Sequence, residues 1–239
     1  MQRSLTFVFL ILLSITVEAA QFIEPGNENI RYTGRWDRSN PSQPWSYAKG
    51  TSLIANFYGS GISATFSDTS TDYLRIIIDG ADSDSTKIQV TPGATSYELA
   101  SGLNDSLHSI EIVKETDAGR WSFQGFDIEG TDARIEVPPA VLARKLVFYG
   151  DSNLGGDSLE HEQNQSARSL RGSYYGFAGI VSRMFNAQYS NISRSGASIR
   201  SLHASFDRID WFTPGLLWDL SVDPPQAVII NIGANDVGR

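Results

Sequence analysis

The sequence predicts two domains, an antiparallel β domain over residues 21–135 and an α/β domain with a parallel sheet over residues 141–239. Many short β-type runs separated by turn residues fill the first part, whereas strand-like and helix-like segments alternate in the second. With 239 residues, 41% of them hydrophobic and 19% charged, the chain is long enough for two modest cores and has the composition of a folded protein.

The first domain is defined by runs rich in Ile, Val, Phe and Tyr at near-regular spacing. Turn pairs such as Asp79-Gly80 and Pro92-Gly93 lie between these runs. Many short strands with this spacing predict a sandwich of two antiparallel sheets, similar to a jelly roll. The expected strands are 30–36, 52–58, 61–66, 72–79, 86–91, 107–114 and 121–129.

A polar segment, 131–139, separates the two predicted domains. It ends in Pro138-Pro139, and because two prolines cannot continue a sheet ladder, we expect a linker here. Alternating strands and a helix follow, and this alternation predicts a flavodoxin-like parallel sheet. The expected strands are 145–149 (KLVFY), 187–192 and 226–232 (QAVIINI), and the expected helix is 173–185. The fully apolar QAVIINI run is typical of a buried parallel strand.

The charge and cysteine content exclude several classes of partner. The net charge is −8 and the sequence pI is about 4.9. Such an acidic chain is a poor partner for nucleic acid, whose phosphates need a footprint of lysine and arginine, but it is compatible with a neutral polysaccharide. With no cysteine, the chain has neither disulfides nor a thiolate metal site.

Residues 1–20 predict a cleaved signal peptide. Arg3 supplies a positive start, an apolar run follows over 5–15, and Val17-Glu18-Ala19 fits the small-residue pattern before a cleavage point. A membrane anchor is the alternative, but a spanning helix needs about 20 apolar residues and this run is shorter. We therefore expect a secreted, extracellular or periplasmic protein with no membrane attachment after cleavage.

Three short motifs follow the three expected strands of the second domain. Gly150-Asp151-Ser152 comes after KLVFY, Ser195-Gly196-Ala197 after the second strand and Gly233-Ala234-Asn235-Asp236 after QAVIINI. The carboxyl ends of parallel strands meet at one rim of a sheet, which is where ligands bind in such folds. A Gly-Asp-Ser tripeptide alone is also typical of a helix-capping turn, so the inference depends on all three motifs together.

This trio, in this order and at strand ends, resembles the SGNH hydrolase superfamily. The resemblance implies that Ser152 is the nucleophile of an ester hydrolase. It also implies an oxyanion hole made by the backbone N–H groups of Ser152 and Gly196 and the side-chain amide of Asn235. Fixed donors of this kind stabilise the negative charge of a tetrahedral intermediate. Asp151 and Asp236 would hold loops by hydrogen bonds rather than take part in the chemistry.

Two further features resemble carbohydrate esterase family 2. One is the β domain in front, and the other is the stretch from Trp211 through Trp218-Asp219 and Pro224-Pro225 into Asn231–Asp236. Members of that family remove acetyl groups from plant polysaccharides, often at the sugar 6-hydroxyl. The resemblance implies a polysaccharide acetyl esterase of the acetylxylan esterase kind. No cluster with metal-ligand spacing occurs, so we expect no metal and no cofactor. The alternative is a non-catalytic carbohydrate-binding or adhesion protein on the same fold.

A catalytic base is missing from this pattern. A serine hydroxyl attacks only when a base within hydrogen-bond reach accepts its proton. In SGNH enzymes the base is the histidine of an Asp-x-x-His segment near the end of the domain, but no histidine follows His203 and the expected α/β domain has no such segment. We therefore expect a truncated, poorly stable and inactive chain whose base lies beyond Arg239. The alternative is that His203 or His161 acts as the base.

Overall fold

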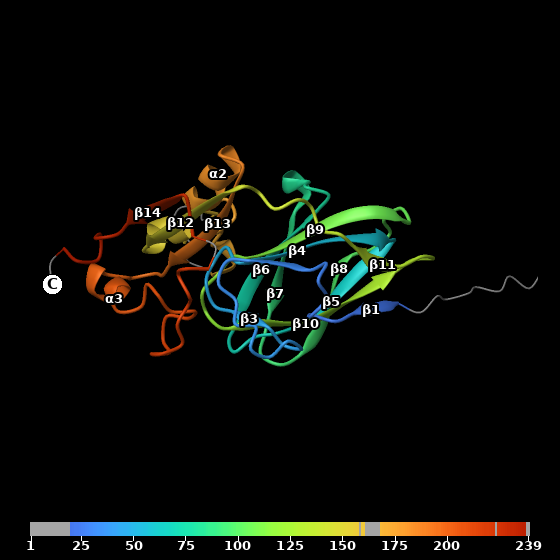
Figure 1. The fold of residues 1–239 in the computed structure, drawn as a ribbon, viewed down its shortest axis with the longest axis horizontal. Coiled ribbons are helices and arrows are strands. Elements are labelled where there is room, and N and C mark those ends of the chain that lie inside the picture. The colour runs from blue at the N-terminus through green and yellow to red at the C-terminus, as the bar shows by residue number, and fades with distance from the viewer. Residues whose placement is uncertain (1–19, 158, 161–167, 223, 238–239) are drawn as a thin grey trace, which may run out of the picture.

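The computed structural model describes residues 20–157, 159–160, 168–222 and 224–237. Figure 1 shows a β domain of two antiparallel sheets and, at its carboxyl-terminal end, a smaller parallel sheet flanked by short helices. None of the helices in the described ranges is long and apolar enough to cross a membrane. The expected signal peptide lies outside the described residues, apart from Ala20.

The β domain is built from two facing sheets. In the first, the strand order is β1-β10-β5-β8 and β3 also pairs with β10. These strands are β1 (Gln21–Ile23), β3 (Trp45–Ser46), β5 (Gly61–Ser67), β8 (Thr95–Ala100) and β10 (Trp121–Glu129). In the second, the order is β11-β4-β9-β6-β7 and β2 also pairs with β4. Its strands are β2 (Arg31–Thr33), β4 (Ser52–Gly59), β6 (Asp72–Ile78), β7 (Thr86–Val90), β9 (Ser106–Lys114) and β11 (Arg134–Glu136). A short 3₁₀ helix, η1 (Asp82–Asp84), joins β6 to β7.

Alternating apolar residues create the core between these sheets. Along β4, Leu53, Ala55 and Phe57 are fully buried, while the residues between them face outward or are half-buried. β5 contributes Ile62 and Phe66 from the opposite sheet to the same cluster. Every strand expected from the sequence is present in this domain. The sequence missed β1, β3, β8 and β11, and β11 lies within the segment expected to be a linker.

The parallel sheet has the order β13-β12-β14, and each flanking strand pairs with β12 in parallel register. The strands are β12 (Arg144–Gly150), β13 (Ala187–Ser193) and β14 (Ala227–Asn231). The helices of this part are α1 (Ser152–Gly155), η2 (Arg168–Leu170), α2 (Phe177–Met184) and α3 (Ile199–His203). The helix expected over 173–185 begins only at Phe177, because Gly176 is an extended N-cap and the residues before it form a turn.

The two faces of the parallel sheet are covered differently. α2 packs on one face, where Phe148 and Leu154 form a cluster with Ala178. On the other face, Tyr149 packs with Leu202 of α3, so the sheet lies between α2 and α3 in Figure 1. β14 is an edge strand of this sheet and its outward side chains remain largely exposed, 52% for Val228 and 66% for Ile230. The expectation that the apolar QAVIINI run is a buried strand is therefore wrong, because β14 pairs with β12 on one side only and most of its described side chains are exposed.

Polar contacts join the β domain to the parallel-sheet part. The Arg35 guanidinium donates a hydrogen bond to the Tyr149 hydroxyl at 2.8 Å, and the backbone N–H of Tyr174 donates to the buried carboxylate of Glu115 at 2.8 Å. Glu115 also forms an ion pair with Arg75. These groups hold the carboxyl rim of the parallel sheet in a fixed position against the β domain.

Candidate active site

Ser152 lies at the carboxyl end of the central strand of the parallel sheet. β12 ends at Gly150, and Asp151 caps the next helix, accepting a hydrogen bond from the backbone N–H of Asn153 at 3.0 Å. Ser152 is therefore the first residue of α1 and is half-buried. Gly150 is required here because a Cβ atom would collide with the backbone carbonyl of Asn231 on the neighbouring strand. The structure of this turn therefore accounts for the presence of Gly150 and Asp151 in the Gly-Asp-Ser motif.

The second and third motifs are tied to each other at the same rim. The Asn235 side-chain amide donates a hydrogen bond to the backbone carbonyl of Ala197 at 2.9 Å. The Asp236 carboxylate accepts one from the backbone N–H of Ile199, with 3.0 Å to the nearer oxygen. As the sequence predicted for Asp151 and Asp236, both carboxylates hold loops through backbone hydrogen bonds. Gly196 is exposed and has a φ of +74°, a conformation that favours glycine.

The loop of the second motif is also tied to the turn of the first. The Ser195 hydroxyl donates a hydrogen bond to the carboxylate of Asp157, which follows α1. The backbone N–H of Asp157 donates in turn to the Ser152 carbonyl at 3.2 Å. Through these contacts, and through the Asn235–Ala197 bond, the structure links all three predicted motifs into one connected site.

A solvent-open hollow of about 210 Å³ lies beside Ser152. Its described lining includes Ser152, Asn153, Gly156, Asp157 and Leu159. Gly156 caps α1 in the left-handed conformation at φ 71°, and a Cβ atom there would collide with the carbonyl of Gly172. Of the predicted site residues, Ser152 lines this hollow, whereas Gly196 and Asn235 are not among its described lining.

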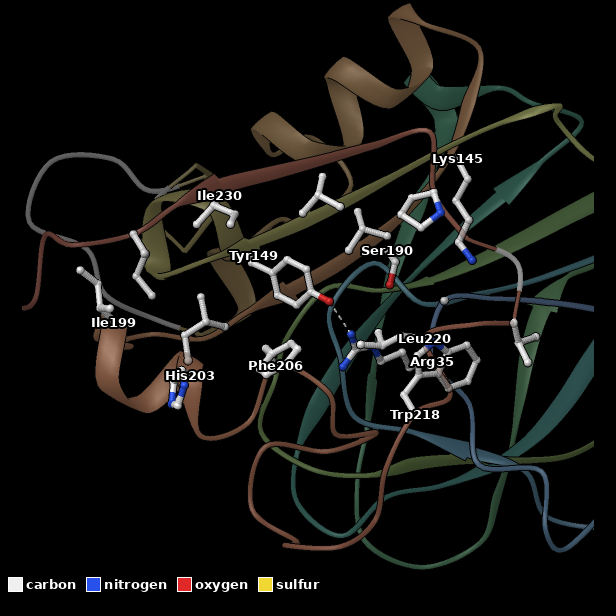
Figure 2. A pocket seen from close by; sticks show the side chains of 17 residues that line it. Arg35, Lys145, Tyr149, Ser190, Ile199, His203, Phe206, Trp218, Leu220 and Ile230 are labelled. Carbon is white, nitrogen blue, oxygen red and sulfur yellow. Dashed lines mark hydrogen bonds between the residues drawn. The ribbon is translucent and has the colours of Figure 1, made fainter.

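The larger cavity of this part, about 540 Å³, lies on the α3 face of the sheet and is a different place (Figure 2). His203, Tyr149, Phe206 and Trp218 are among its mainly apolar lining, and Ser152 is not. His203 therefore does not line the hollow beside Ser152, contrary to the hypothesis that it acts as the base there.

His108 does not supply that base either. An Asp-x-x-His spacing does occur at Asp105–His108, but it lies in the β domain, where the His108 ring bonds to the carboxylate of Asp79 at 2.7 Å. Hydrogen bonding to Asp79 and to the Asn104 carbonyl outweighs burial and raises the pKa of His108. His161 lies outside the described residues.

Sequence reasoning missed the groups that surround the motifs. Lys49 comes from the β domain, yet it is fully buried and forms an ion pair with Asp157. Neither Lys49 nor Asp157 belongs to a local pattern that marks a site, so only the docked structure reveals the pair. Within the described ranges there is no group of three or more histidine, cysteine, aspartate or glutamate side chains that could hold a metal ion.

The β domain and the parallel-sheet part that carries the rim motifs are both similar to parts of known carbohydrate esterases. Residues 32–138 match the family model of the carbohydrate esterase 2 N-terminal domain. The chain is 31% identical over 232 residues to the cellulase/esterase CelE of Acetivibrio thermocellus. The aligned region covers 92% of this chain but only 28% of that protein. Residues 32–138 are thus similar to the N-terminal domain of carbohydrate esterase family 2, the family that the sequence resembles, and the chain spans about a quarter of the length of CelE.

Solved structures extend the likeness over most of the chain. A family two carbohydrate esterase from Clostridium thermocellum, in complex with cellohexaose, aligns with a TM-score of 0.80 at 28% identity over 87% of this chain and 67% of that one. An acetyl xylan esterase from the rumen bacterium Butyrivibrio proteoclasticus aligns with a TM-score of 0.82, over 92% of this chain and 66% of that one. At 19% identity, this second likeness concerns the fold alone.

Proposed function

We propose that the chain supplies the nucleophile and the oxyanion-binding groups of a serine esterase that removes acetyl groups from a polysaccharide of the hemicellulose type. One observation carries the proposal: three motifs from three strand ends are joined by hydrogen bonds at one rim, with Ser152 facing a small open hollow. The likeness to carbohydrate esterases supports the substrate class.

The proposed reaction has two steps. The Ser152 Oγ attacks the acyl carbon of the ester, its proton passes to a base, and the carbonyl oxygen becomes an oxyanion. The backbone N–H groups of Ser152 and Gly196 and the Asn235 amide donate hydrogen bonds to that oxyanion. The sugar hydroxyl then leaves with a proton, and water hydrolyses the acyl-serine to give acetate and free Ser152. Neither His203 nor His108 is proposed as the base, because His203 lines the cavity on the α3 face and His108 bonds to Asp79 in the β domain.

The second candidate is carbohydrate binding without turnover. It is favoured by the Clostridium thermocellum relative, whose structure holds cellohexaose, and by the exposed aromatic side chain of Phe212 near the rim. The Arg194 guanidinium lies 4.6 Å from the centre of the Phe212 ring, and Tyr47 packs edge-on against the same ring. Phe212 stays 56% exposed beside these contacts, so under this second candidate its ring would pack against a sugar of the glycan.

The test compares the protein with Ser152→Ala and with the matched control Ser221→Ala. Ser221 is exposed and its hydroxyl bonds only within its own loop, to Asp219. Where hydrolysis of an aryl acetate or of acetylated xylan is measured, we expect it, and labelling of Ser152 by a fluorophosphonate, to be lost in Ser152→Ala and kept in Ser221→Ala. Hydrolysis by these 239 residues would overturn the expectation of an inactive chain. Equal turnover in Ser152→Ala would show that the nucleophile is wrong. Absent turnover and labelling with retained binding of cello-oligosaccharides would support the second candidate.

We also propose that the protein is exported and that residues 1–20 are removed on the way. The support is the positive start, the short apolar run and the small residues before Ala20. Intact mass spectrometry of the protein from the culture medium or periplasm of its host measures the mature start. A secreted chain that still begins at Met1 would contradict this proposal.

A further inference from the structure

A buried cluster of charged side chains lies where the β domain meets the Ser152 turn. Lys49 and Asp117 come from the β domain, and Asp157 and Arg171 come from the parallel-sheet part. The Lys49 Nζ pairs with Asp157 and lies 3.6 Å from Asp117, while Arg171 lies 3.6 Å from Asp157 and 3.9 Å from Asp117. The Lys49 side chain is fully buried and both carboxylates are only 8% exposed. Two positive and two negative groups thus balance each other.

Asp157 differs from the other members because it also contacts the candidate site. One of its carboxylate oxygens pairs with Lys49 and the other accepts the hydrogen bond from the Ser195 hydroxyl. Ser195 directly precedes Gly196, and Asp157 follows Ser152 by one helical turn. A single carboxylate therefore spans the distance between the turn that carries the nucleophile and the loop that carries an oxyanion donor.

The Gly196 position itself is open, although Ala197 beside it is buried in the cluster of Tyr149 and Leu202. Apart from its chain neighbours, no described atom lies within 4 Å of the place where a Cβ of Gly196 would be, so the Gly196 peptide is positioned by what holds Ser195 and Ala197. The loop is held on one side by the Ser195–Asp157 hydrogen bond and on the other by the bond from Asn235 to the Ala197 carbonyl. An oxyanion donor is effective only if its N–H is fixed before the charge develops, so the accuracy of these anchors affects the rate.

We propose that Asp157, held by Lys49 of the β domain, is a positioning residue that fixes the orientation of the Gly196 N–H through its hydrogen bond with the Ser195 hydroxyl. This inference rests on the proposed esterase function. Loss of the anchor then lowers the rate of the acyl-transfer step and leaves substrate affinity nearly unchanged, because the ground-state ester makes little use of the oxyanion donor. If the cluster only holds the two parts together, substitution of any of its charged residues should lower kcat to a similar extent.

The experiment uses this contrast within the full chain. Ser195→Ala removes the hydroxyl, Ser195→Thr keeps it, and Asp157→Asn leaves one oxygen that can serve either Lys49 or Ser195 but not both. Asp117→Asn is the matched control, because it makes the same charge change in the same cluster without contact to Ser195. Thermal unfolding confirms that each variant is folded.

We expect Ser195→Ala and Asp157→Asn to lower kcat on an aryl acetate about 10-fold with KM within about 2-fold, since loss of a whole oxyanion donor costs about 10²–10³. The double variant with Ser195→Ala and Asp157→Asn has the same kcat as either single variant. Ser195→Thr restores kcat, and Asp117→Asn keeps it within about 2-fold of the parent chain. The inference is overturned if Asp117→Asn loses as much as Asp157→Asn, or if Ser195→Ala keeps the parent kcat.

Hydrogen exchange of the Ala197 amide provides a readout that does not need turnover. This amide donates to the Arg194 carbonyl at 3.1 Å across the Gly196 loop. We expect faster exchange in Ser195→Ala and Asp157→Asn but not in Asp117→Asn. If the parent chain has no measurable turnover, the loss of fluorophosphonate labelling at Ser152 tests the proposed function separately, and the exchange rates decide the positioning role. Unchanged exchange in Ser195→Ala overturns it.

Discussion

The buried carboxyl group of Asp68 gives the β domain a pH-dependent stability. Asp68 is 6% exposed, and one of its oxygens accepts a hydrogen bond from the backbone N–H of Ser70 at 3.0 Å. The other oxygen is buried and receives no hydrogen bond. Burial raises the pKa of Asp68 to about 7; the Asp72 carboxylate adds to this shift and the Lys114 ammonium opposes it.

The raised pKa has a definite sign in the free energy of unfolding. The folded state holds the Asp68 proton more tightly than the unfolded chain, whose aspartates titrate near pH 4. The stabilisation is therefore complete below about pH 4 and is lost as the pH rises through about 7. One pKa unit corresponds to about 1.4 kcal/mol, which sets an upper limit of about 4 kcal/mol. We expect about half of this, roughly 2 kcal/mol, because the neighbouring Asp72–Lys114 pair can adjust to the new charge.

Asp68→Asn tests this reasoning because the amide keeps the shape and the acceptor for Ser70 but cannot ionise. We expect this variant to be about 2 kcal/mol more stable than the parent chain at pH 8, with a difference near zero at pH 4. Urea unfolding of the β domain, followed by tryptophan fluorescence from pH 4 to 8, measures it. Asp132→Asn, at an exposed position, is the control and changes stability by less than about 0.5 kcal/mol. A gap between parent and Asp68→Asn that is the same at pH 4 and pH 8 would refute the argument.

Three further predictions follow from single contacts. Asn235→Ala removes a proposed oxyanion donor and the bond to the Ala197 carbonyl, and should lower kcat on an aryl acetate by about 10²–10³ while thermal unfolding still shows a folded chain. Lys114→Met leaves the fully buried Asp72 without its cation, and should cost about 3–5 kcal/mol in urea unfolding at pH 7. Gly150→Ala forces a methyl group against the Asn231 carbonyl, and should give less soluble protein and lower turnover than Gly26→Ala, where a Cβ atom would meet only the Pro41 carbonyl at 4.0 Å.

The strands with a strong local pattern were predictable from the sequence, and the short ones were not. β4 and β12 carry enough apolar residues to mark a strand by themselves. β1, β3 and β11 are two or three residues long and exist because a neighbouring strand offers hydrogen-bonding groups at its edge. β8 (TSYELA) is mostly polar and exposed, so its pattern does not distinguish it from a loop.

The rim of the site was predictable for a topological reason. Motifs that follow parallel strands come together whatever the rest of the fold does, so the proximity of the Ser195–Ala197 and Gly233–Asp236 loops followed from strand order alone. The ion pair between Lys49 and Asp157 joins residues 108 positions apart in different domains. No periodicity or spacing relates them, and the contact exists only after the two parts have docked.

The ion pair between Lys49 and Asp157 indicates what the β domain contributes to the site. Burying Lys49 with Asp157 carries a desolvation cost that an apolar contact between the same surfaces would not, so the pair is a poor source of stability. A buried ion pair instead restricts the relative placement of its two partners, because any displacement leaves a charge unpaired in a dry environment. Asp157 is the partner that also contacts Ser195, and through it this restriction reaches the loop of Gly196. On this proposal, the β domain acts on the geometry of the candidate site from within the interface, through Lys49 and Asp157.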